Sequence, residues 1–144
     1  MKTDKIEALA REIAAREATR AAARAAAHRL AEELYAQVTA AVERFAETVR
    51  ASGAPHLDLI TVGPVEPDDK SIRAYQFRVC RGRWQGIVVS KDRGEIMLVG
   101  PFNRGGEEGP CSSIHFSEGE SALEKARGPL EAFLISLIET SFQK

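Results

Sequence analysis

The sequence predicts an α+β fold: a long N-terminal helix, an antiparallel β-meander of four to five strands, and a C-terminal amphipathic helix packed on the sheet. Three observations support this prediction. Residues 5–51 contain neither Gly nor Pro, residues 56–102 alternate apolar runs with short turn signals, and the large apolar residues of 130–142 recur at helical spacing.

The first helix is expected to span residues 4–51. Ser52-Gly53 followed by Pro55 is a stop signal, because glycine takes the left-handed cap position and proline cannot continue a helix. The second half of this helix carries apolar residues at intervals of three or four, so we expect it to pack on a core. These residues are Leu30, Leu34, Val38, Ala41, Val42, Phe45 and Val49.

The first half of the helix has a different composition. Of the 22 alanines in the chain, 17 lie in residues 1–51, and alanine is the only apolar residue type within residues 14–29. Alanine favours helix but buries little area. We therefore divide the chain into a helical arm rich in Ala and Arg (residues 1–29) and a single α+β domain (residues 30–144).

The first helix is too long for its own domain. About 47 residues make a helix of about 70 Å, whereas a compact chain of 144 residues has a diameter of roughly 40 Å. Either the helix bends or frays within residues 14–29, or the arm projects and packs on a second subunit. We favour the second subunit, which makes the arm an oligomerisation element of a homo-oligomer. The candidate contact residues are Ile13, Arg16, Arg20, Arg24 and His28.

The middle of the chain predicts a meander. Arg81-Gly82-Arg83 and Asp92-Arg93-Gly94 are typical of tight turns, and connections this short require antiparallel pairing. The strands are expected at residues 56–64, 72–80, 84–91 and 95–102, with a short fifth at 113–117.

Both faces of this sheet are partly apolar, whereas a half-solvated antiparallel sheet shows one clean polar face. Something should therefore cover each face. The simplest arrangement places one helix on each face. The alternative places both helices on one face and leaves for a partner an apolar patch of Trp84, Val88, Met97 and Val99.

Residues 70–93 are the most distinctive segment, with seven cations against one acid and interleaved aromatic residues. Cationic side chains contact phosphates or carboxylates and aromatic rings stack on bases, so this hairpin suits an acidic protein partner or nucleic acid. Alternatively, the arginines cover a sheet edge and the acidic residues of 103–144 neutralise the hairpin internally. The candidate partner-binding residues are Arg73, Arg78, Arg81, Arg83, Trp84, Arg93 and Arg104.

No motif identifies an enzyme class, a metal site or a cofactor site. Cys111 and His115 would lie about 13 Å apart along a strand, too far to share one metal ion. The glycine-rich loop at residues 103–112 lacks the ending of a phosphate-binding loop, and its Glu107-Glu108 pair would repel phosphate. We therefore expect no catalytic residue, no metal and no cofactor.

The net charge of −1 gives no global attraction to nucleic acid or to a membrane. No apolar run approaches the roughly 18 residues of a membrane span, and the first thirty residues carry acids but no signal-peptide core. We expect a cytoplasmic protein without a membrane partner. The use of 14 Arg against 6 Lys, with many alanines, indicates a bacterial source.

The first functional hypothesis is a non-enzymatic interaction protein of the adaptor type, a homo-oligomer whose Arg-rich hairpin binds an acidic partner. The alternative is a nucleic-acid-binding dimer that uses the same arginines. A second alternative is an enzyme whose site carries no recognised motif.

Overall fold

The computed structural model describes residues 3–70, 72–106 and 109–143, and it confirms the α+β fold. Its elements in chain order are helix α1 (Asp4–Ala51), the 3-10 turn η1 (Pro55–Leu57), strands β1 (Ile60–Val62), β2 (Glu66–Pro67), β3 (Ala74–Arg81), β4 (Trp84–Lys91), β5 (Glu95–Asn103) and β6 (Cys111–His115), and helix α2 (Ala122–Gln143).

The strands form one antiparallel sheet in the order β1-β3-β4-β5-β6, with β2 also paired to β3. The meander of β3, β4 and β5 follows the prediction from the turn signals. The strand expected at residues 56–64 is shorter, because Pro55 begins the 3-10 turn and only Ile60–Val62 is extended.

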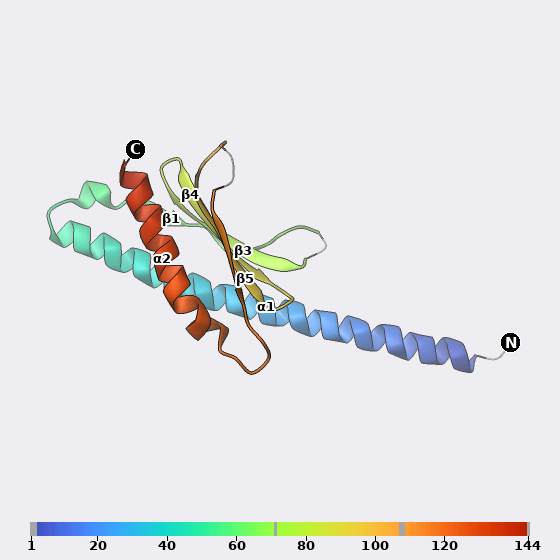
Figure 1. Cartoon of the computed structure of the whole chain (residues 1–144). Helices are drawn as coiled ribbons and strands as arrows, with labels where there is room; N and C mark the ends of the chain where they lie inside the picture. Colours follow the sequence, from blue (N-terminus) through green and yellow to red (C-terminus); the bar gives the residue numbers. More distant parts are fainter. Residues whose placement is uncertain (1–2, 71, 107–108, 144) are drawn as a thin grey trace.

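Both helices pack on the same face of the sheet, as Figure 1 shows, so the expectation of one helix on each face is wrong. Each helix buries an apolar stripe on this face, α1 against β3 and β4 and α2 against β4 and β5. The buried core consists of Leu30, Leu34 and Val38 from α1, of Ile60, Phe77, Val79, Val88, Ile96 and Leu98 from the sheet, and of Ala126, Leu130, Phe133 and Leu137 from α2.

The other face of the sheet has no helix over it in the part of the chain that the structure describes, and we call it the open face. The apolar patch predicted for it is only partly right. Val88 pairs directly with Phe77 in the core, and paired residues share a face. Val88 is therefore buried under the helices, and Trp84 packs against the same core. Met97 and Val99 lie on the open face.

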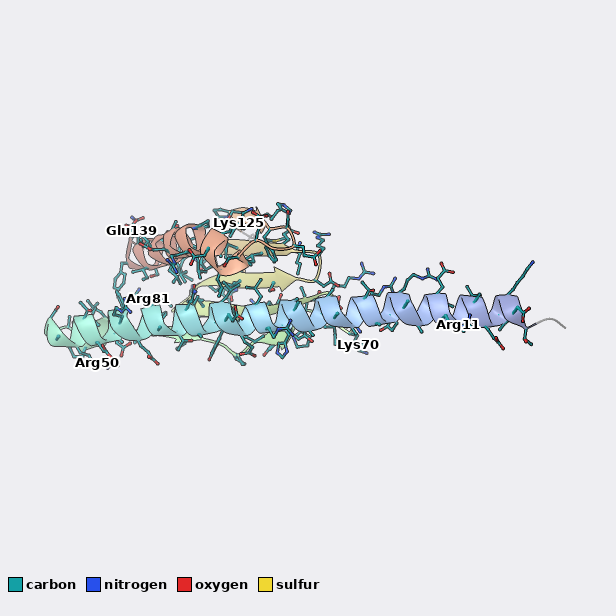
Figure 2. The ribbon with its side chains drawn as sticks, turned by 90° about the horizontal axis from the view of Figure 1, so that it is seen from below. Arg11, Arg50, Lys70, Arg81, Lys125 and Glu139 are labelled. Carbon is teal, nitrogen blue, oxygen red and sulfur yellow. The ribbon has the colours of Figure 1, made fainter. Side chains whose placement is uncertain are left out.

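α1 runs unbroken over 48 residues, about 72 Å, so the alternative of a helix broken within residues 14–29 is wrong. Residues 3–22 are exposed, and the first buried residue of α1 is Ala27. Figures 1 and 2 show the N-terminal part of α1 extending past the sheet.

Two contacts attach α1 to the sheet at the point where the projecting arm begins. The buried Ser90 of β4 donates from Oγ to the carbonyl oxygen of Ala27 at 2.9 Å. The ring of His28 stacks on the ring of Tyr75 in β3, with 4.4 Å between centroids. Because α1 is straight, its attachment at this point sets the direction of the projecting arm.

α2 continues through Pro129, although Gly128-Pro129 predicts an interruption. Proline removes one helical hydrogen bond. Ala126 and Leu130, on either side of the proline, are both buried against the sheet, and this shared packing keeps the two segments in one helix.

Gly86 allows α2 to approach the sheet closely. The register of β4 against β5 shifts between Gln85 and Ile87, and a Cβ added at Gly86 would lie 2.4 Å from Cζ of Phe133. The ring of Phe133 therefore occupies the space that a side chain at residue 86 would need.

We expect Gly86→Ala to lower the free energy of unfolding by about 1–3 kcal/mol, because overfilling a packed core forces side chains out of their rotamers. Urea denaturation measures this loss. The double variant Gly86→Ala/Phe133→Leu should lose less than the sum of the two single variants, since leucine removes the conflicting ring. Wild-type stability of Gly86→Ala would contradict this account of the packing.

Candidate binding surface of the sheet

The open face has an apolar centre. Val89, Val99 and Phe102 are each only 8–9 % exposed, so neighbouring residues cover these side chains although none of the described helices lies over them. Loop residues of the same chain lie against the two ends of this face. Asp68 lines the same cavity as Val89, and a Cβ at Gly109 would contact the side chain of Phe102.

Arg78 lies in the middle of the open face. Its side chain is exposed, and Nη1 donates to Oε1 of Gln85 at 3.1 Å. Glutamine is neutral, so this contact orients the guanidinium without neutralising its charge. Arg78 is thus a cation presented beside the apolar centre.

A cavity of about 350 Å³ lies at the end of the open face formed by the β4–β5 turn. Its cations are Arg73, Lys91 and Arg93. Asp68 also lines it, but Oδ1 of that carboxylate already accepts backbone N–H groups of Asp69, Arg73 and Ala74 at 2.9–3.3 Å. Asp68 therefore holds the loop before β3 in place.

Glu95 lies beside this cavity and is not among the binding residues that the sequence predicts. Its side chain is 7 % exposed and its carboxylate lies 3.4 Å from Nζ of Lys91, 2.9 Å from Nη2 of Arg93 and 3.7 Å from Nε2 of His115. Burial raises the pKa of Glu95, but hydrogen bonds from Arg93 and Ser113 and the charge of Lys91 outweigh it and lower the pKa. The sequence signal for this site is an acid directly after the β4–β5 turn, two residues from Arg93 and four from Lys91.

Arg73 differs from its neighbours Lys91 and Arg93. Those two cations share Glu95, whereas the side chain of Arg73 is exposed and makes no ion pair within the described residues. This end of the face thus has three acids, Asp68, Asp92 and Glu95, beside its three cations, and among those cations the side chain of Arg73 is the one without an ion pair in the described part of the chain.

The opposite end of the sheet carries a second cationic pair. Arg83 lies in the β3–β4 turn and Arg104 in the loop after β5, and the backbone N–H of Arg104 donates to the carbonyl oxygen of Arg83 at 2.6 Å. Both residues are exposed. The Glu107-Glu108 pair of the same loop lies outside the described residues.

Arg81 points away from the open face. Its guanidinium carbon lies 3.4 Å from the ring centroid of Phe142, and Nη1 donates to the carbonyl oxygen of Ser141 at 2.9 Å. Burial lowers the pKa of Arg81, but an arginine remains charged at neutral pH. Arg81 and Trp84 thus belong to the helix-covered side, whereas the other five candidates lie on the open face or at its ends.

The aromatic residues of the hairpin also belong to the helix-covered side. Phe77 is 1 % exposed, Tyr75 stacks on His28, and Trp84 packs against the core. These three rings are therefore not available on the open face for stacking on bases.

The candidate oligomerisation residues divide into those that are exposed and those that contact residues of their own chain. Ile13 is 51 % exposed, and Arg16 and Arg20 are exposed on the projecting arm. Arg24 forms an ion pair with Glu17 at 3.1 Å. His28 contacts Tyr75 and also lies 3.4 Å from Glu32, so Arg24 and His28 have partners in their own chain.

Within the described ranges, no group of three His, Cys, Asp or Glu residues could hold a metal ion, and no helix has the length and apolarity of a membrane span. Cys80 of β3 and Cys111 of β6 are free thiols. Cys111 and His115 begin and end the extended strand β6, which keeps their side chains apart.

We expect Arg81→Ala to lower the free energy of unfolding by about 1–2 kcal/mol, because a desolvated cation–π contact and a hydrogen bond to α2 are lost together. Arg83→Ala is the matched control, since it removes an exposed arginine two residues away and should change stability by less than about 0.5 kcal/mol. Urea unfolding of both variants tests the assignment, and equal losses would refute it.

Glu95 predicts a pH dependence of stability. Because the pKa of Glu95 is lowered in the folded state, its contribution is complete above the unfolded value of about 4.3 and is lost as the pH falls through the folded value. Glu95→Gln should cost about 1–3 kcal/mol at neutral pH, and the difference from wild type should shrink below pH ~4. Denaturation at several pH values measures this, with the exposed Glu47→Gln as control. A difference that stays constant down to pH ~3 would contradict the assigned ion pairs.

Comparison of the chain with protein-family models, with curated proteins and with solved structures finds no match. The functional conclusion therefore depends on the geometry of the chain itself.

Proposed function

We propose that this is a non-enzymatic interaction protein that self-associates and binds an acidic protein partner on the open face of its sheet. The observation that supports this most directly is the placement of both helices on one face. That arrangement leaves the other face without a helix over it in the described residues and with cations along its length.

The charges of the open face suit an extended acidic surface better than a small anion. Within the described residues the side chains of Arg73, Arg83 and Arg104 make no ion pair, and the guanidinium of Arg78 donates a hydrogen bond to the neutral Gln85. β3 and β4 have eight residues each, so the two cationic ends lie about 26 Å apart. A partner that reaches both ends must carry carboxylates at a comparable spacing.

Nucleic acid is the second candidate, because the same cations could contact phosphates. Single-stranded nucleic acid is usually held by aromatic stacking as well as by charge. The interleaved rings of the hairpin lie under the helices or against the core, and this placement favours a carboxylate-bearing partner.

Binding to poly-L-glutamate and to a single-stranded oligonucleotide of equal charge tests the proposal. We expect the full-length protein to bind poly-L-glutamate at low salt, and Arg73→Gln/Arg78→Gln to weaken that binding about tenfold, the equivalent of roughly 1.4 kcal/mol. The matched control Arg16→Gln/Arg20→Gln removes the same charge from the arm and should bind like wild type. Fluorescence titration of labelled polymer gives the affinities.

Three results would decide against the proposal. Tighter binding of the oligonucleotide, weakened by the same face variant, would establish the nucleic-acid alternative. If neither polymer binds at low salt, the cationic open face is not a binding surface for acidic partners. Equal weakening by the face variant and the arm variant would show that only net charge matters.

A further inference from the structure

We propose that the arm of one copy docks into a groove at the root of the arm of a second copy, and that two such contacts make a reciprocal dimer. This inference rests on the self-association in the proposed function and assigns the surfaces that produce it. The binding of an acidic partner by the open face is independent of it.

The first surface is a ridge on the arm. Ile6, Leu9 and Ile13 are 55 %, 51 % and 51 % exposed. At about 100° per residue their side chains fall within an arc of about 60° on one side of α1. Helices that dock into grooves present large apolar residues at this spacing. We call these three residues the apolar ridge.

The second surface is a groove of about 640 Å³ where α1 leaves the sheet, which we call the root groove. On one side it is lined by α1, chiefly through Ala22, Ala23 and Ala26. On the other side it is lined by the β4–β5 turn and by the segment around Phe116 that leads to α2. Because alanine side chains are small, the backbone of another helix can come close to α1 here.

The apolar ridge cannot fill the root groove of its own chain. Both surfaces lie on the one unbroken helix α1, with their centres about 16 residues, or about 25 Å, apart along its axis. A second copy running antiparallel can place its ridge there.

The midpoint between ridge and groove also suits this arrangement. It falls near residue 18, within the segment 14–29 where alanine is the only apolar residue. A two-fold axis at that point forms the same contact twice, as a closed dimer requires.

The charges beside the two surfaces are complementary. Lys5 and Glu12 flank the apolar ridge, and Arg29 and Glu33 line the root groove. None of these four side chains makes an ion pair within the part of the chain that the structure describes, although neighbouring arm residues do. Asp92 and Glu118 also line the root groove and make no ion pair in the described part of the chain, so the groove offers more acidic than basic groups to Lys5 of a second copy.

Light scattering of full-length protein over a concentration series tests the proposal. The ridge variant is Ile6→Glu/Leu9→Glu/Ile13→Glu, and the groove variant is Ala22→Trp/Ala26→Trp. We expect wild type to have the mass of a dimer and both variants to have the mass of a monomer. The control is Ala14→Glu/Ala21→Glu/Ala25→Glu, which adds three charges to exposed positions on the side of α1 that faces away from both the apolar ridge and the groove lining, and it should remain dimeric.

A mixture of the two variants gives a second readout. The ridge variant keeps an intact groove and the groove variant an intact ridge, so one contact can still form between them. We expect the mixture to show dimers that neither variant forms alone. Circular dichroism and thermal unfolding of each variant verify that the domain is folded.

The outcomes separate this inference from self-association in general. A dimeric groove variant beside a monomeric ridge variant would show that the ridge binds elsewhere and would overturn the inference alone. A dimeric ridge variant, or a mixture that stays monomeric, would also overturn it. A wild type that is monomeric at every concentration would overturn both the inference and the proposed self-association.

Discussion

The packing of both helices on one face of the sheet is the constraint on which the rest of the molecule depends. α1 packs on β3 and β4 and α2 on β4 and β5, and both bury their apolar residues in one core with Phe77 and Val88. Two consequences follow from this one arrangement. The opposite face has no helix over it in the described residues, and the straight helix α1 leaves the domain beyond Ala27. The open face and the projecting arm are therefore products of the same core.

Small residues on the helix-covered face make that arrangement possible. Gly86 leaves room for the ring of Phe133, and Ser90 is short enough for its hydroxyl to reach the carbonyl oxygen of Ala27. Larger side chains at either position would push a helix away from the sheet. Because α1 is rigid over 48 residues, a shift at its root would displace the whole arm. The local fit at β4 thus controls the geometry of a surface far along the helix.

Local sequence rules predicted the elements well and the cross-strand relations poorly. The absence of Gly and Pro predicted α1, and the turn signals predicted β3, β4 and β5. Within each strand the predicted apolar patch is right, since Trp84 shares a face with Val88 and Met97 shares a face with Val99. The error arises between strands: Val88 pairs with Leu98, and this register is set by the β4–β5 turn, which no single-strand pattern reveals. Arg81 is a different case: its charge groups it with the other arginines, although it alternates with Phe77 and Val79 in β3 and therefore lies on their face of the sheet.

The arm contains two kinds of apolar residue: alanines, which helix formation explains, and larger residues, which it does not explain. Alanine has the highest helix propensity, so the alanines account for a helix that continues beyond its own core. Isoleucine is a poorer helix former, because its branched side chain loses rotamer freedom in a helix. Ile6 and Ile13 are more than half exposed and contribute nothing to the core of their own chain. Helix propensity therefore explains the alanines of the arm but not its ridge, and the proposed contact with a second copy gives a reason for large apolar residues there.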